Sequence, residues 1–148
     1  MGKHRSYKRF IGYSTAFRQW KADSHCSTIH GYAFCFKVWF EGELDDKGWV
    51  IDFGCFKRNG VKEWMKNMFD HTTCVAADDP ELPLFEEMDN RGIIDLRVFE
   101  DGVGCEKFAQ YVANYLHEIV QKETDGRVSV YKVQCWEQED NMAECYIL

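Results

Sequence analysis

Hydrophobic and polar residues alternate in two separate stretches of the chain. Residues 33–41 place an apolar side chain at every second position: Phe34, Phe36, Val38 and Phe40. Residues 127–136 alternate in the same way. A period of two is typical of a strand with one buried face, so both stretches are predicted strands. Aromatic and β-branched residues predict another strand over 7–17, and residues 144–148 predict a closing strand.

Two other stretches have the spacing of an amphipathic helix. The first follows Asp52, whose carboxylate can accept hydrogen bonds from the exposed N–H groups of a first turn. Its apolar face is formed by Phe56, Val61, Trp64, Met65 and Met68. Gly60 lies within this helix and weakens it by about 1 kcal/mol relative to alanine. A second helix is predicted over 105–122, and residues 124–126 end it.

The remaining segments are predicted turns and loops. Residues 42–48 indicate a hairpin turn before a short strand at 49–51. Residues 76–90 are acidic, contain both prolines and are predicted to form the longest loop. The order strand, strand, helix, helix, strand, strand predicts an α+β fold, with a four-stranded antiparallel sheet and two helices on one face. Because the other face would stay uncovered in a monomer, we expect a homo-oligomer.

Composition narrows the class of protein. A length of 148 residues fits a single domain over 1–148, and a net charge of −7 argues against a nucleic-acid-binding protein. A basic cluster near the N-terminus is either a solvated arm or a contact for a phosphorylated substrate. The seven cysteines are widely spaced and form no Cys-x-x-Cys pair, which fits reduced thiols and a cytoplasmic location. No apolar run is long enough to predict a membrane span.

The segment 25–32 carries two groups of residues suited to chemistry. Cys26 lies beside His25 and close to His30. A thiolate is both a nucleophile and a base, and a cationic neighbour lowers its pKa. His30 and Tyr32 lie two residues apart at the start of a strand, so their side chains face the same side and could share a metal. The structural alternatives are a bystander thiol and two hydrogen-bonded polar rings.

Two more candidates follow later in the chain. Asp70 directly precedes His71 after the first helix, and a carboxylate that orients an imidazole suits general acid–base catalysis near neutral pH. Glu137 lies at the end of a predicted strand, where it could accept a bidentate pair of hydrogen bonds from a guanine-like ring edge. The structural alternatives are a polar turn at a helix end and a solvated strand end.

The order of these motifs is more specific than any one of them. Over about residues 13–146 the chain carries Cys26-x3-His30-Gly31, then Trp49-Val50-Ile51-Asp52-Phe53, Phe69-Asp70-His71 and Glu137. This order resembles that of the 6-pyruvoyl-tetrahydropterin and 6-carboxytetrahydropterin synthase family. The resemblance implies the tunnelling fold, a ββααββ unit that assembles into a barrel-containing homohexamer with sites at subunit boundaries. It also implies a lyase that eliminates triphosphate from 7,8-dihydroneopterin triphosphate to give a 6-substituted tetrahydropterin, with zinc polarising side-chain oxygens.

The same resemblance assigns roles to individual residues. It implies catalysis by Cys26, Asp70 and His71, substrate binding by Glu137 and Glu106, and zinc binding by His30. Two further zinc histidines of the family pattern are replaced here by Phe17, on the first strand, and by Tyr32. Phenylalanine cannot bind a metal and tyrosine is an unusual zinc ligand, whereas catalytic zinc normally has three protein ligands. Zinc is therefore expected only if His25 or Tyr32 completes a rebuilt site with His30.

Two functions of different classes follow. The first is a divergent pterin synthase with a reshaped or absent metal site, serving the biosynthesis of biopterin, folate or queuosine-like bases. The second is an oligomeric tunnelling-fold protein that binds a pterin or purine through Glu137 without turnover. Cys26, Asp70 and His71 favour the enzyme, whereas Phe17 and Tyr32 favour the binding protein. The expected ligand of the enzyme is a small pterin triphosphate, with no nucleic-acid or membrane partner.

Overall fold

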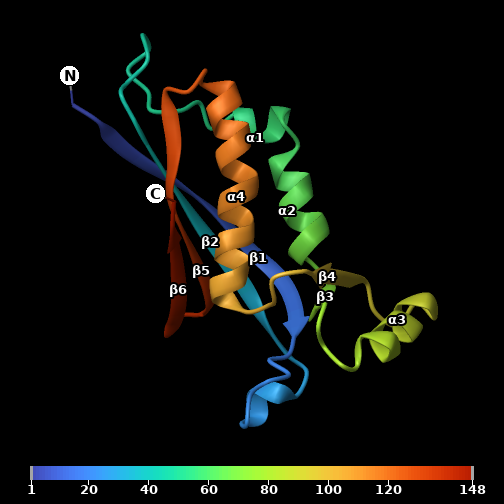
Figure 1. The fold of residues 1–148 in the computed structure, drawn as a ribbon. Coiled ribbons are helices and arrows are strands. Elements are labelled where there is room, and N and C mark those ends of the chain that lie inside the picture. The colour runs from blue at the N-terminus through green and yellow to red at the C-terminus, as the bar shows by residue number, and fades with distance from the viewer. Residues whose placement is uncertain (1, 148) are drawn as a thin grey trace.

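A computed structural model describes residues 2–147 (Figure 1). Within these residues the strands are β1 (His4–Phe17), β2 (His30–Gly42), β3 (Thr72–Ala76), β4 (Leu96–Phe99), β5 (Val128–Gln138) and β6 (Asn141–Tyr146). The helices are α1 (Cys55–Arg58), α2 (Val61–Phe69), α3 (Leu82–Asn90) and α4 (Cys105–Glu123), with a single 3-10 turn, η1, at His25–Ser27. The strands form one sheet in the order β4-β3-β1-β2-β5-β6.

The antiparallel part of the sheet consists of β1, β2, β5 and β6. One face of this part is apolar and carries α2 and α4, which lie side by side on it (Figure 1). The alternating residues of β2 that the sequence predicted to be buried are 0% exposed on this face: Phe34, Phe36, Val38 and Phe40. The α+β class is therefore confirmed.

The prediction of a four-stranded antiparallel sheet is wrong, because β3 and β4 extend the sheet beyond β1. β3 pairs in parallel with the last three residues of β1, and β4 pairs in parallel with β3. All five residues of β3 are buried, so the strand shows no alternation, and β4 has only four residues. The expected ββααββ order therefore contains an insertion of β3, α3 and β4 between α2 and α4.

The predicted loop at 76–90 is also wrong, since this segment contains α3. Parallel strands need a crossover connection, and α3 lies in the crossover from β3 to β4. Pro83 lies in the first turn of α3, where its missing N–H removes no helical hydrogen bond. The acidic stretch is thus the connection that parallel pairing requires.

The segment between β2 and α2 departs from the prediction in three ways. Residues 49–51 form no strand, although Val50 and Ile51 are buried in the core. The predicted helix is split into α1 and α2 at Gly60, whose φ of 71° lies in the left-handed region that favours glycine. Asp52 lies ahead of the cap residue Gly54 and accepts a hydrogen bond from its N–H at 2.9 Å.

The C-terminal strand differs from its predicted range at both ends. The closing strand predicted at 144–148 begins earlier, at Asn141, and ends at Tyr146; Leu148 lies outside the described residues. No helix in residues 2–147 is long and apolar enough to cross a membrane.

Candidate active site

A cavity of about 160 Å³ lies where the ends of β1 and β5 meet η1 and the starts of β2, α4 and β6. Six of the residues singled out in the sequence line it: Phe17, Cys26, His30, Tyr32, Glu106 and Glu137. The pairing of β1 with β2 and of β2 with β5 brings these distant positions to one end of the sheet. The fold therefore gathers a thiol, an imidazole, a phenol and two carboxyl groups around one space.

Cys26 lies on the turn η1, which other parts of the chain hold in place. Its N–H donates to the Ser24 hydroxyl oxygen at 3.3 Å, and its carbonyl accepts from the backbone N–H of Gln19 at 2.8 Å. Arg18 donates to the next carbonyl in the turn, that of Ser27, at 3.3 Å. The thiol is thus carried on a short anchored turn, with partial exposure.

Arg18 is itself fixed by a carboxylate from the acidic segment 76–90. Its guanidinium forms a two-pronged ion pair with Asp79, with N–O distances of 2.8 and 2.6 Å. Asp79 is only 4% exposed, and the Arg18 guanidinium holds the pKa of this carboxyl below its usual range. The segment that the sequence indicated as a loop therefore supports the turn that carries the thiol.

Each carboxylate oxygen of Glu137 contacts a neighbouring side chain. The Asn141 side-chain amide donates to Oε1 at 3.3 Å, and the Cys105 thiol lies 4.0 Å from Oε2. Both neighbours line the cavity, as does Gln19, and the sequence did not indicate any of the three. Their local patterns are those of a turn, a helix start and a loop, so only the fold identifies them.

Glu106 and Gly104 lie at the start of α4. Glu106 is exposed in the first helical turn, where the helix dipole favours a carboxylate. Gly104 has a φ of 113°, and a Cβ at this position would lie 2.2 Å from the Gln19 amide nitrogen. Glycine therefore permits the close approach of α4 to the loop after β1.

The three positions that the family pattern reserves for zinc ligands converge in this structure. Phe17 pairs with His30 across β1 and β2, with ring centroids 4.7 Å apart. Tyr32 lies on the same face, 5.6 Å from the His30 ring and 6.5 Å from the Phe17 ring. We call Phe17, His30 and Tyr32 the aromatic cluster. Its geometry brings three rings together, and only one of them is an imidazole.

These residues do not fit a zinc site. The Nδ1 atom of His30 donates to the Thr28 carbonyl, 2.8 Å away, and leaves Nε2 as a ligand atom, as in metal-binding histidines. The misfit lies in the other two positions, because Phe17 has no ligand atom and the phenol of Tyr32 is an unusual zinc ligand. His25 is exposed on η1 and does not line the cavity. Over residues 2–147, no three His, Cys, Asp or Glu side chains are grouped closely enough to hold a metal ion.

The phenol of Tyr32 is close to charged groups in the cavity. Burial raises the pKa of Tyr32, and the negative charge of Glu137 raises it further. The hydroxyl group therefore keeps its proton at neutral pH and remains a hydrogen-bond donor.

Asp70 and His71 form the expected carboxylate–imidazole pair, but they lie away from this cavity. Asp70 Oδ1 accepts from the Ser14 backbone N–H and contacts His71 Nδ1, each at 3.1 Å. These hydrogen bonds, that of Ser14 above all, hold the pKa of Asp70 below its usual value. His71 has a φ of 57° and a side chain that is 83% exposed. It borders a second hollow of about 690 Å³, which shares Tyr32 with the cavity but which neither Cys26 nor Glu137 lines.

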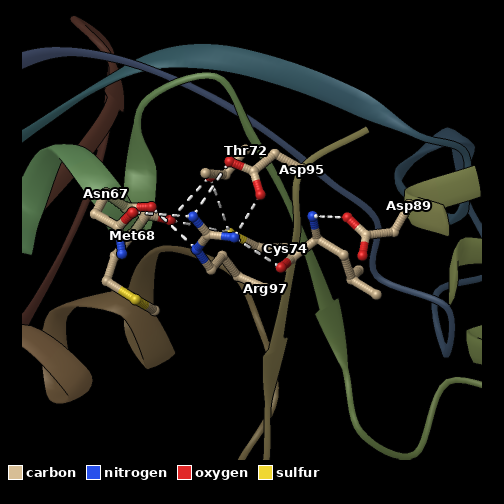
Figure 2. Close-up of polar contacts among 8 residues, drawn as sticks. Asn67, Met68, Thr72, Cys74, Asp89, Asp95 and Arg97 are labelled. Atoms are coloured by element: carbon tan, nitrogen blue, oxygen red, sulfur yellow. Dashed lines mark hydrogen bonds and ion pairs between the residues drawn. The ribbon is translucent and has the colours of Figure 1, made fainter. Parts of the chain in front are cut away.

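An arginine from β4 fixes the end of α2 just before Asp70 (Figure 2). The Arg97 guanidinium donates to the Asn67 carbonyl at 3.0 Å and to the Asn67 side chain at 3.2 Å. It also forms two hydrogen bonds with Asp95, at 2.6 and 3.2 Å. The inserted strands thus hold the helix end from which Asp70 and His71 project.

Comparison with known proteins identifies the family to which this chain belongs. Residues 7–147 match the sequence profile of the family described as 6-pyruvoyl tetrahydropterin synthase, and the chain belongs to this family. A protein of Pyrococcus horikoshii named "Putative 6-carboxy-5,6,7,8-tetrahydropterin synthase" is 28% identical over 139 residues, which cover 88% of this chain and 82% of that protein. A 6-carboxy-5,6,7,8-tetrahydropterin synthase of Rickettsia conorii is 31% identical over 75 residues, which cover 50% of this chain and 54% of that protein.

Solved structures share the fold at lower sequence identity. An uncharacterized protein, WS1659 from Wolinella succinogenes, superposes with a TM-score of 0.83 at 19% identity, covering 99% of both chains. The 6-pyruvoyl tetrahydropterin synthase of Plasmodium vivax superposes with a TM-score of 0.69 at 16% identity, covering 97% of this chain and 98% of that chain. A tetrahydropterin-synthase-like function is therefore the one that the relatives support.

Proposed function

We propose that this protein is a lyase that eliminates triphosphate from 7,8-dihydroneopterin triphosphate and forms a 6-substituted tetrahydropterin. The observation that carries the proposal is that Cys26 and Glu137 line the same cavity although they are far apart in sequence. Glu137 would bind the pterin ring edge through its carboxylate, and the Cys26 thiolate would remove a proton from the side chain of the bound substrate. The reaction requires a group that fixes the pterin ring and a base that reaches its side chain, and these two residues would supply both in one cavity.

The proposed site is shared between copies of the chain. His71 borders a different hollow from Cys26, and Asp70 does not line the cavity of Cys26 either, so one copy alone does not gather the three groups around one space. The exposed His71 imidazole is available to a neighbouring molecule. In the proposed assembly, a homohexamer, the Asp70–His71 pair of one copy acts beside Cys26 of another, where the imidazole can relay a proton to or from the thiol.

The proposal is tested by supplying purified protein with 7,8-dihydroneopterin triphosphate. We expect release of inorganic triphosphate together with a new tetrahydropterin, resolved by chromatography. Cys26→Ala should abolish the release while pterin binding persists, because the thiolate is the proposed base. Glu137→Gln should raise KM by about tenfold or more, because the charge-assisted hydrogen bonds to the ring are lost.

The alternative that the sequence left open is a binding protein without turnover. Wild type that binds a pterin but releases no triphosphate would support that function and contradict the lyase. In that case Glu137→Gln would weaken binding as before, whereas Cys26→Ala would change nothing measurable.

A further inference from the structure

We propose that the aromatic cluster of Phe17, His30 and Tyr32 is a metal-independent subsite, in which the Tyr32 hydroxyl stabilises negative charge on a substrate oxygen. This inference rests on the proposed lyase function and assigns to Tyr32 the task for which the family pattern uses zinc. Tyr32 would thereby be a further catalytic residue.

The rings that surround Tyr32 fix its position. Its ring meets those of Phe17, His30 and Phe34 at centroid distances of 6.5, 5.6 and 6.0 Å, and the last two contacts are edge-to-face. Phe17 and Phe34 are 2% and 0% exposed, so they belong to the rigid core. A phenol held in this way points its hydroxyl along one direction, and a donor that is already oriented costs little reorganisation in a reaction.

The location of Tyr32 suits contact with the reacting part of a substrate. It lines the cavity together with Cys26 and Glu137, the proposed base and the proposed ring anchor. A substrate whose ring binds Glu137 and whose side chain meets Cys26 therefore lies against the aromatic cluster. Phe17 offers that side chain only apolar contact, so the hydroxyl of Tyr32 and the free ring nitrogen of His30 are the polar groups of the cluster.

The chemistry of the side chain needs such a donor. The Cys26 thiolate first removes a proton from the side-chain carbon next to the one that bears the triphosphate; the electron pair of that C–H bond forms a C=C bond, and the C–O bond to triphosphate breaks. The thiol then gives its proton to the terminal carbon as the resulting enol becomes a ketone, and the enol hydroxyl proton passes to water. The regenerated thiolate removes a second proton, from the carbon on the other side of the ketone. The electron pair of the broken C–H bond moves onto the carbonyl oxygen, the thiolate becomes a thiol, and the oxygen becomes an enolate. A hydrogen bond from the Tyr32 hydroxyl stabilises this oxygen, and the tyrosine keeps its proton throughout.

Metal content tests the first half of the inference without any measurement of activity. Purified wild type is incubated with zinc, dialysed and analysed by mass spectrometry, and we expect far less than one equivalent per chain. The double variant Phe17→His, Tyr32→His should bind about one equivalent, because these two positions and His30 already converge. Adding His30→Ala should remove that zinc. One equivalent in wild type that is lost on His30→Ala would overturn the inference.

The kinetics of Tyr32→Phe test the second half. This variant keeps the ring and its packing and removes only the hydroxyl, so we expect kcat to fall by about 10²-fold while KM changes little. Tyr115→Phe is the matched control: its ring stacks on Trp64 at 3.7 Å, outside the cavity, and activity should be unchanged. Unchanged kcat in Tyr32→Phe would contradict the role of the hydroxyl, whatever the folding state of the histidine variants.

The two proposals fail in different ways. Wild type with no turnover under any condition contradicts the lyase function and, with it, the catalytic role of Tyr32. Wild type whose turnover is abolished by a chelator and restored by zinc supports the lyase and contradicts only the metal-independent subsite.

Discussion

Among single residues, Asp79 supports the candidate site without taking part in it. Its carboxylate is nearly inaccessible and receives both prongs of Arg18, which in turn donates to the turn that carries Cys26. Asp79→Ala leaves the partly buried guanidinium without its partner, so we expect a loss of about 3 kcal/mol in the free energy of unfolding, measured by urea denaturation. The matched control is Glu87→Ala, which removes an exposed arginine pair in α3 and should cost less than about 1 kcal/mol.

Asp79 also leads to a prediction about how the free energy of unfolding depends on pH. The Arg18 guanidinium lowers the pKa of Asp79 in the folded protein relative to the unfolded value of about 3.9. The stability that the pair contributes is therefore fully present above about pH 5 and is lost as the pH falls through the lower folded pKa. Urea midpoints measured from neutral to acidic pH should fall less steeply for Asp79→Asn than for wild type. Parallel curves for the two proteins would contradict this assignment.

At the scale of secondary structure, the insertion of β3, α3 and β4 gives the Asp70–His71 pair its support. Arg97→Ala removes four hydrogen bonds of the guanidinium, two to Asn67 in α2 and two to Asp95. We expect kcat to fall severalfold, because Asp70 and His71 lose their fixed position, while pterin binding at Glu137, which neither residue contacts, stays close to wild type. Activity assays and fluorescence titration with a pterin separate the two effects.

The control for this variant is Arg91→Ala, which breaks one exposed ion pair within α3. Its kcat and its pterin affinity should both match wild type. Equal losses of kcat and of pterin affinity in Arg97→Ala would indicate general destabilisation instead of a positioning role.

The elements that the sequence predicted are those with a strong period. β2 alternates over its buried face and α4 carries a long apolar stripe, so both were predictable within a few residues. β3 is uniformly buried and β4 is very short, and their parallel pairing depends on β1, which lies far away in the sequence. Local pattern contains no information on such a pairing, so the sequence predicts a loop where the structure has the crossover helix α3.

The candidate site was predictable to a similar degree. Motif order indicates Cys26, His30 and Glu137, and the family resemblance adds Glu106; all four line one cavity. The supporting contacts of Asn141 and Cys105 with Glu137 arise only from packing between elements. The spacing of His71 and Cys26 in the sequence likewise does not predict that they line different hollows, because this depends on how the elements pack.

At the scale of the whole molecule, the two borders of the antiparallel sheet suggest how copies associate. Only the last three paired residues of β1 contact β3, so within residues 2–147 the long remainder of β1 has no strand on its outer side. β6 forms the opposite border of the sheet. Unpaired strand edges readily pair with other chains, and pairing of β1 with β6 of the next copy would close a ring and remove both edges.

A ring of this kind predicts complementation between inactive variants. Cys26→Ala and His71→Ala are expected to be inactive alone, because each removes one group from every site. If each site takes Cys26 from one copy and His71 from another, random mixing on co-expression leaves about a quarter of the sites with both groups intact, and activity should recover to about that level. Light scattering should give about six times the chain mass of 17.4 kDa for both variants and for the mixture. A hexamer without recovered activity would place Cys26 and His71 of the same copy in one site, whereas a monomer would remove the basis for a shared site.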